Sequence, residues 1–223
     1  MPGNSRVDLI AFDLDGTLVD SRRDLADSVN ALLAELSRPP LPEAVVGTMV
    51  GDGAKQLVER ALAASHVDTP PPDALARFLR HYEARLLVHT KPYDGIPDLL
   101  EALRSRGVRL AVLTNKPQGA AEHVLEGLGL KKWFDAGVVG AEAAYPRKPD
   151  PAGLIALAAG VDVPIGRTML VGDGSQDLET AHRAGALFCA ARYGYGFPTV
   201  EPLLTTADVI IDRPGQLLEA IAS

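Results

Sequence analysis

Acidic side chains follow two apolar segments whose composition suits buried strands. Asp13 and Asp15 come directly after "VDLIAF", and Asp173 and Asp177 come after "RTMLV". While the chain stays extended, Asp13 and Asp15 project to the same side, where two like charges are costly without a cation or a shared proton. Carboxylate oxygens are ligands that Mg²⁺ prefers. The four aspartates therefore predict a Mg²⁺ site.

A hydroxyl, an amide and an ammonium group follow two further segments of this kind. Thr114 and Asn115 stand where "VRLAVLT" ends, and Lys148 follows "AGVVGA" within "RKPDP". Active sites of open parallel sheets lie at the carboxyl ends of the strands, so we expect one common site. Such a site can neutralise the charge on a transferring phosphoryl group. Helix capping by Thr114 and a surface loop charge at Lys148 remain alternatives.

The elements that must position these residues alternate from residue 94 onward. Helical segments such as "PDLLEALRSRG" are followed by short apolar segments such as "VRLAVLT" and "TMLVG". The alternation predicts an α/β fold with a Rossmann-like parallel sheet and helices on both faces. Four glycines are expected to end helices in the left-handed conformation: Gly107, Gly129, Gly160 and Gly185.

The residues between the first strand and this regular region predict a helical insertion. It contains three helical stretches separated by the proline-rich breaks "RPPLP" and "TPPP", near residues 21–36, 53–65 and 73–88. We interpret residues 20–89 as a helical cap domain, inserted into a catalytic core formed by residues 1–19 and 90–223.

The tetrapeptide VGDG occurs in both units, at residues 50–53 and 171–174. No other segments pair at this offset, so the chain has no internal repeat. The second copy delivers Asp173 after a strand, whereas the first predicts a flexible cap loop that faces the substrate. Lys55 or Gln56, in the helix that follows the first copy, is a candidate to bind a substrate carboxylate, together with free backbone amides. A solvated Lys55 is the alternative.

Composition limits the function classes. The chain has 223 residues, 47% of them hydrophobic, and a net charge of −7, which disfavours nucleic acid and anionic membranes as partners. The beginning of the chain lacks a signal-like apolar region, so we expect a cytoplasmic protein. Cys189 is a single cysteine in an apolar segment, and the five histidines lack metal-ligand spacing.

Four motifs in this order resemble those of the haloacid dehalogenase superfamily, and within it the phosphoglycolate phosphatase family: "DLDGTLVDS", "LTN", "KPDP" and "VGDGSQD". The resemblance implies that Asp13 is the nucleophile that forms an aspartyl-phosphate and that Asp15 is the general acid and base. It implies phosphate binding by Thr17, Thr114 and Asn115. Lys148 would steady the nucleophile and the phosphoryl oxygens.

The resemblance also implies the metal ligands. Mg²⁺ would be held by the Asp13 carboxylate, the Asp15 backbone carbonyl and Asp173, with Asp177 as a ligand or a support. Gly174 departs from the pattern, because many relatives carry serine there.

The expected function is Mg²⁺-dependent hydrolysis of a small phosphorylated metabolite, with 2-phosphoglycolate as the leading substrate, by a monomer or homodimer. A phosphomutase of the same fold, similar to β-phosphoglucomutase, is an alternative. A phosphatase for another small phosphate or for pyrophosphate is a further one, and a binding module without catalysis is a distant third class.

Overall fold

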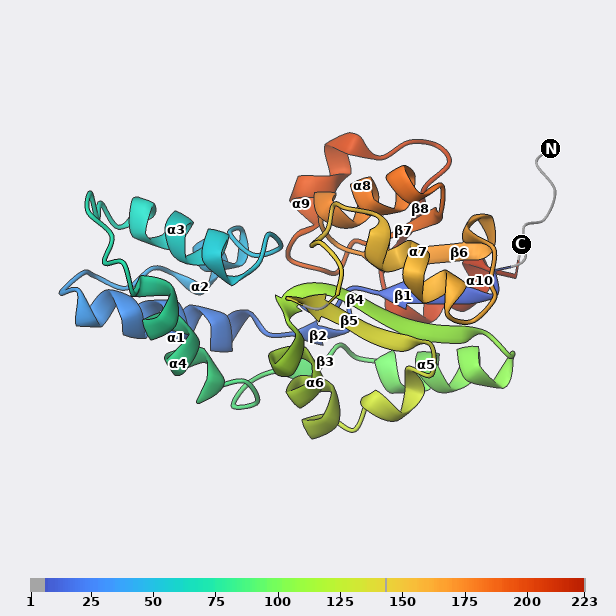
Figure 1. Cartoon of the computed structure of the whole chain (residues 1–223), viewed down its shortest axis with the longest axis horizontal. Helices are drawn as coiled ribbons and strands as arrows, with labels where there is room; N and C mark the ends of the chain where they lie inside the picture. The colour runs from blue at the N-terminus through green and yellow to red at the C-terminus, as the bar shows by residue number, and fades with distance from the viewer. Residues whose placement is uncertain (1–6, 143, 223) are drawn as a thin grey trace.

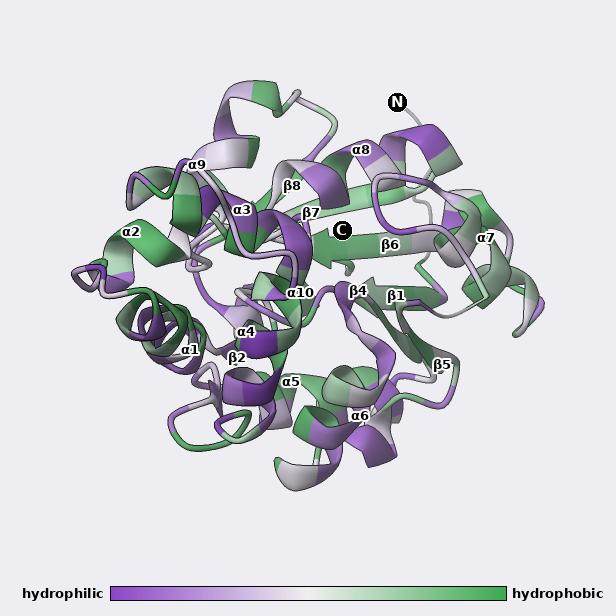
Figure 2. Cartoon of the chain, turned by 60° about the vertical axis from the view of Figure 1, so that its left-hand side comes forward, coloured by the Kyte–Doolittle hydropathy of each residue, from purple (hydrophilic) through white to green (hydrophobic). Residues whose placement is uncertain are grey.

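A parallel sheet forms the centre of the computed structural model, which describes residues 7–142 and 144–222. Its six strands have the order β5-β4-β1-β6-β7-β8. In this order they are β5 (Gly137–Ala141), β4 (Arg109–Pro117), β1 (Leu9–Phe12), β6 (Thr168–Gly172), β7 (Leu187–Ala191) and β8 (Val209–Ile211). Every residue of β1 and β6 is buried. Continuous apolar segments of this kind are typical of parallel strands covered on both faces, and Figure 2 shows the central strands as mostly hydrophobic. The predicted α/β fold is confirmed.

Helices cover both faces of this sheet. Ile10 and Phe12 of β1 pack on the same side as α5 (Ile96–Ser105), α6 (Gln118–Gly127) and α10 (Leu217–Ala220). Leu9 and Ala11 point to the other side, which is covered by α7 (Ala152–Ala159), α8 (Ser175–Ala184) and α9 (Phe197–Val200). Alternation along the strand therefore supplies two apolar clusters. Four short 3₁₀ helices complete the core: η1 (Lys131–Trp133), η2 (Ile165–Arg167), η3 (Glu201–Leu203) and η4 (Pro214–Gln216).

The glycines expected to end helices divide into two groups. Gly107, Gly129 and Gly185 have φ of 79°, 67° and 75°, as predicted. The prediction for Gly160 is wrong, because it keeps a right-handed conformation with φ of −62° after α7. Asp162 takes the left-handed conformation instead, with φ of 55°. An aspartate tolerates this region better than most residues do, so the turn is displaced by two positions.

Four helices stand apart from the sheet at its carboxyl edge, on the left of Figure 1. They are α1 (Arg22–Glu35), α2 (Glu43–Gly47), α3 (Ala54–Ala64) and α4 (Ala74–Glu83). The sequence predicted three of them and missed the short α2, and it extended the last to residue 88, where the chain already turns. We refer to these helices as the cap. The boundaries proposed at residues 19/20 and 89/90 stay an interpretation, and residues 1–6 lie outside the described part.

The chain enters and leaves the cap at neighbouring points. β2 (Val19–Asp20) pairs antiparallel with β3 (Lys91–Pro92), so the two connections run side by side. Neither of these two-residue strands was predicted, and neither was β8. Such short strands depend on their partners more than on their own composition.

A buried carboxylate fastens the cap to this crossing. Asp24 of α1 is fully buried and accepts hydrogen bonds from the backbone amides of His89 and Thr90, at 2.9 and 2.8 Å, and from the Thr90 hydroxyl at 2.7 Å. Its charge is dispersed over donors that would otherwise be buried without partners.

No helix in the described part of the chain is long and apolar enough to cross a membrane.

Asp24→Asn is expected to lower the free energy of unfolding by about 1–3 kcal/mol, because the amide replaces an acceptor with a donor that faces the same N–H groups. Asp27→Asn, on the exposed side of the same helix, is the matched control. Urea unfolding followed by far-ultraviolet circular dichroism measures both. Equal stability of the two variants would contradict this role for Asp24.

Candidate active site

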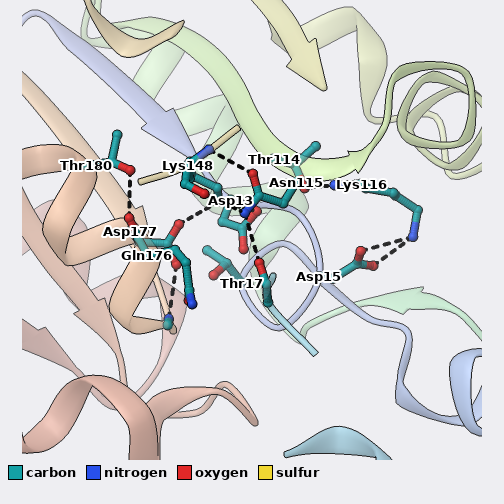
Figure 3. A network of polar contacts seen from close by, with 12 residues as sticks. Asp13, Asp15, Thr17, Thr114, Asn115, Lys116, Lys148, Gln176, Asp177 and Thr180 are labelled. Carbon is teal, nitrogen blue, oxygen red and sulfur yellow. Dashed lines mark hydrogen bonds and ion pairs between the residues drawn. The ribbon is translucent and has the colours of Figure 1, made fainter. Parts of the chain in front are cut away.

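The chemistry-bearing residues meet at the carboxyl end of β1. The chain runs from β1 outward through β4 and β5 and then returns to β6 on the other side, so β1 lies at the topological switch point. Asp13 follows β1, and its backbone amide donates to the Val171 carbonyl of β6 at 2.8 Å. Thr114 and Asn115 lie in β4, and Asp173 follows β6. Figure 3 shows the side chains of Asp13, Thr114 and Asn115 close together at this point.

Lys148 is the cation at the centre of one group of carboxylates. Its Nζ lies 2.8 Å from Oδ1 of Asp13 and donates to Oδ1 of Asp177 at 2.6 Å. Only 2% of the Lys148 side chain is exposed. Burial alone would lower the pKa of Lys148, but Asp13 and Asp177 outweigh it and hold the pKa above its ordinary value. The lysine is therefore charged, and it is not a surface loop charge.

Three carboxylates in this group could hold a metal ion. One oxygen each from Asp13, Asp173 and Asp177 lies within 4.8 Å of the others, and all three residues are buried. Burial, with Asp177 and Asp15 nearby, raises the pKa of Asp13 to about 6 although Lys148 opposes the shift. Burial, Asp13 and Asp177 raise the pKa of Asp173 well above its usual range. One lysine does not compensate this charge, so a hard divalent cation fits the donor set.

The surroundings of Asp173 and Asp177 differ. Asp173 accepts from the Gly196 backbone amide at 2.7 Å and from the Thr17 hydroxyl at 3.3 Å. Asp177 uses one oxygen for Lys148 and the other for the Gly174 backbone amide at 3.0 Å. Both oxygens of Asp177 thus already have donors, an arrangement that favours support of the cluster over direct ligation. The Thr17 hydroxyl points to Asp173.

Gly16 allows the loop after β1 to lie against Asp173. Its φ of +90° disfavours any other residue, and a Cβ atom there would overlap the Asp173 carboxylate. The glycine in "DLDG" therefore sets the spacing between the first and last motifs.

The two aspartates of "DLD" have different partners. The expectation that they project to the same side depended on an extended chain, but β1 ends at Phe12. Asp15 accepts from Lys116 Nζ at 3.0 Å on each oxygen and from the Ser21 hydroxyl at 2.6 Å. Each aspartate is thus held by its own lysine.

Lys116 is a site residue that the sequence interpretation missed. The predicted strand ended at Thr114, whereas β4 continues to Pro117 with a shift in its register between Leu113 and Pro117. Because the strand is irregular here, alternation along it could not have singled out Lys116. Thr114 is buried and its hydroxyl accepts from the Lys116 backbone amide at 3.2 Å.

Asn115 braces the loop that carries Lys148. Its Oδ1 accepts from the Lys148 amide at 2.9 Å, and its Nδ2 donates to the Lys148 carbonyl at 3.1 Å and to the Gly51 carbonyl at 3.0 Å. The side-chain donors of Asn115 are therefore engaged with backbone. Its predicted contact with phosphate stays a prediction that these bonds do not support.

The first VGDG contacts the core. Besides the bond from Asn115 to Gly51, Asp52 accepts a short hydrogen bond from Gln176 of α8 and pairs with Arg60 of α3. Gln176, just before Asp177, was not predicted, since nothing in the sequence pairs it with the cap. Lys55 is not brought to the cluster: its side chain is 62% exposed and its Nζ lies 3.8 Å from Glu59.

A small cavity lies between the cap and the strand ends. Its volume is about 40 Å³, room for about three water molecules. The core wall contains Asp13, Asp15, Thr114, Asn115, Lys116 and Pro117, and the cap wall contains Leu25, Val50, Gly51, Gly53, Ala54, Leu57, Phe78 and Tyr82. Reactive groups therefore face a largely apolar lid.

Comparison with known proteins shows the family of the chain. Residues 7–185 match the family described as haloacid dehalogenase-like hydrolase. The chain belongs to this hydrolase family. A phosphoglycolate phosphatase of Rhodospirillum rubrum is 45% identical over 87% of this chain and 83% of its own. An N-acetylmuramic acid 6-phosphate phosphatase of Pseudomonas aeruginosa is 34% identical over 97% of this chain and 95% of its own.

Solved structures of the haloacid dehalogenase-like family have the same fold. The crystal structure of a predicted phosphoglycolate phosphatase from Haemophilus somnus superposes with a TM-score of 0.87 at 31% identity, over 96% of this chain and 97% of the other. The resemblance predicted from the four motifs is confirmed. The roles of individual residues stay predictions.

Asp13→Asn is expected to raise the free energy of unfolding at pH 7 without divalent cations, on the order of 1–3 kcal/mol, because it removes a buried charge. The pKa of Asp13 is raised on folding to about 6, so the wild type loses stability as pH rises from about 4 to about 6.

Urea unfolding in chelator at several pH values measures this difference. The difference in the free energy of unfolding between Asp13→Asn and the wild type should grow between pH 4 and pH 6. Asp94→Asn, at an exposed position, should show no such difference. A destabilised Asp13→Asn protein at pH 7 would contradict the charge argument.

Proposed function

We propose that the chain is a Mg²⁺-dependent phosphatase that converts 2-phosphoglycolate to glycolate and phosphate through an aspartyl-phosphate. The observation that carries this proposal is the separation of the two aspartates at one cavity. Asp13 lies in the carboxylate cluster with Lys148, and Asp15 is held outside it by Lys116. This separation supports attack by the Asp13 carboxylate and proton transfer by the Asp15 carboxylate.

The nucleophile in this mechanism is Asp13. Its carboxylate attacks phosphorus, and Lys148 at 2.8 Å offsets negative charge on the nucleophile and on the phosphoryl oxygens. When bound, Mg²⁺ would neutralise further charge between carboxylates and phosphate. Asp13, Asp173 and the Asp15 carbonyl would hold it, with Asp177 in support. Thr114 lines the cavity beside Asp13 and suits a phosphate contact.

Asp15 serves both proton transfers. It gives a proton to the departing alkoxide and then takes one from the water that hydrolyses the aspartyl-phosphate. Splitting one difficult displacement into two is the advantage of covalent catalysis. The closed cavity supports this scheme, because exclusion of bulk water strengthens the electrostatic contacts inside it.

The size of the cavity favours a small substrate. A cavity of about 40 Å³ must widen for any phosphate ester, and a two-carbon acid requires less widening than an amino sugar does. The relative that acts on N-acetylmuramic acid 6-phosphate covers more of this chain, so that compound is the second candidate. The first turn of α3 also borders the cavity with Gly53 and Ala54, where free amides suit a carboxylate.

Other features stay predictions. They are a cytoplasmic location, a monomer or homodimer, and the phosphomutase and pyrophosphatase alternatives. A mutase would need activation by a bisphosphate and would release little free phosphate.

Phosphate release from 2-phosphoglycolate is expected with Mg²⁺ and should stop after chelation. Asp13→Asn should reduce it to background, because the nucleophile is lost. Asp173→Ala should recover part of its activity at higher Mg²⁺, whereas Asp177→Ala should lose about 10–100-fold.

Asp94→Asn is the control for these variants. Full activity after exhaustive chelation, or in Asp13→Asn, would overturn the mechanism. A bisphosphate requirement without phosphate release would favour the mutase.

The wild type is expected to have a higher kcat/KM for 2-phosphoglycolate than for N-acetylmuramic acid 6-phosphate, because the smaller substrate requires less widening of the cavity under the cap. A phosphate-release assay compares them. The reverse preference would assign the second candidate function.

The same assay tests the proposed contact of Lys55 with a substrate carboxylate. In Lys55→Ala, kcat/KM should fall more for 2-phosphoglycolate than for p-nitrophenyl phosphate. Equal falls in kcat/KM for the two substrates would agree with the exposed position of Lys55 and would remove it from the site. Lys132→Ala, on η1, is the matched control.

A further inference from the structure

We propose that Lys116 and Tyr82 are positioning residues that fix the orientation of Asp15 when the cap is closed. The inference rests on the proposed function, because it concerns the proton transfers assigned to Asp15. Tyr82 and Lys116 connect the cap to Asp15, the proposed general acid and base. We call Ser21, Tyr82 and Lys116 the Asp15 clasp.

Lys116 has all of its donors in use. Its Nζ donates to both oxygens of Asp15 at 3.0 Å and to the hydroxyl of Tyr82 through a short hydrogen bond. The Lys116 side chain is 2% exposed. An ammonium group has three protons, so three partners satisfy it. Its position is thus determined from both sides of the cavity.

Tyr82 is the cap's contribution to this group. It lies in α4, is buried, and stacks on Phe78 with ring centroids 5.7 Å apart. The Lys116 ammonium also lies 4.6 Å from the centroid of its ring. Because α4 belongs to the cap and β4 to the core, movement of the cap would separate the two partners.

Ser21 holds Asp15 from a third direction. It precedes α1, where the chain enters the cap, and donates to Oδ1 of Asp15 at 2.6 Å. Asp15 is therefore bonded to the sheet through Lys116 and to the beginning of the cap through Ser21. When the cap opens, the Tyr82 contact is lost and Lys116 gains freedom to turn away. Closure thus brings the carboxylate to one orientation.

The alternative is that Lys116 binds the substrate directly. Of the described residues that line the cavity, it alone has a cationic side chain. However, a substrate anion would have to replace Asp15 or Tyr82, because no donor of the ammonium is free. The contacts therefore favour positioning.

The test compares two small substrates that differ in their leaving groups. Glycolate must receive a proton as it departs from 2-phosphoglycolate, whereas acetate departs from acetyl phosphate without one. For Lys116→Met we expect kcat/KM for 2-phosphoglycolate to fall about 100-fold, and for Tyr82→Phe about 10-fold, within the range of general acid catalysis. For acetyl phosphate kcat/KM should change less than about 3-fold, because it reports steps up to the aspartyl-phosphate.

Tyr93→Phe is the matched control for the hydroxyl. The Tyr93 hydroxyl is buried and has no hydrogen-bond partner among the described residues, so neither substrate should respond. Equal losses for both substrates in Tyr82→Phe and Lys116→Met would indicate a structural or binding role and overturn the proposal. Unchanged kcat/KM for 2-phosphoglycolate would overturn it as well.

Hydrogen exchange of the full chain tests the clasp without turnover. Amides of residues 14–21 should exchange faster in Tyr82→Phe and Lys116→Met than in the wild type, and not in Tyr93→Phe. If the wild type hydrolyses neither substrate, the proposed function fails, and unchanged exchange would then overturn the clasp separately.

Discussion

The confinement of three carboxylates around one lysine is the constraint on which the site depends. Asp13, Asp173 and Asp177 are buried within 4.8 Å of one another, and only Lys148 opposes their charge within the group. Such charges separate unless the backbone that carries them is rigid. Here Asp13 follows the central strand and Asp173 its neighbour, so the sheet itself fixes their distance.

The cap is attached by contacts of two kinds. At the crossing, buried Asp24 is surrounded by donors, and its removal from them would leave charge and amides without partners. Over the cavity, the loop at residues 50–53 contacts the core through polar groups of Asn115 and Gln176. Water can replace polar partners at low cost. The cap therefore has a firm hinge and a releasable contact, an arrangement suited to closure around a ligand.

The sequence predicts this site where chemistry and strand ends coincide, and fails where partners come from distant elements. The four motifs predicted that Asp13, Lys148 and Asp173 share one site, because each follows an apolar segment that suits a parallel strand, and the structure brings these side chains together. The hydrogen bonds between the Asn115 side chain and the Lys148 backbone could not be predicted, because the sequence does not say which loops meet. Gly160 shows the local limit, because a glycine permits a left-handed turn without requiring it.

Two aspartates separated by one residue have different roles only if their surroundings differ. Asp13 shares Lys148 with Asp177, and burial, together with the neighbouring carboxylates, raises the pKa of Asp13. Asp15 pairs with Lys116, which also donates to Tyr82, and accepts from the Ser21 hydroxyl at the beginning of the cap. The turn at Gly16 follows directly and lies against Asp173, since a Cβ atom at Gly16 would overlap the Asp173 carboxylate. A nucleophile needs a fixed position beside compensating charge, whereas an acid and base needs access to the leaving group under the cap. The proposed division of roles between Asp13 and Asp15 thus depends on where β1 ends.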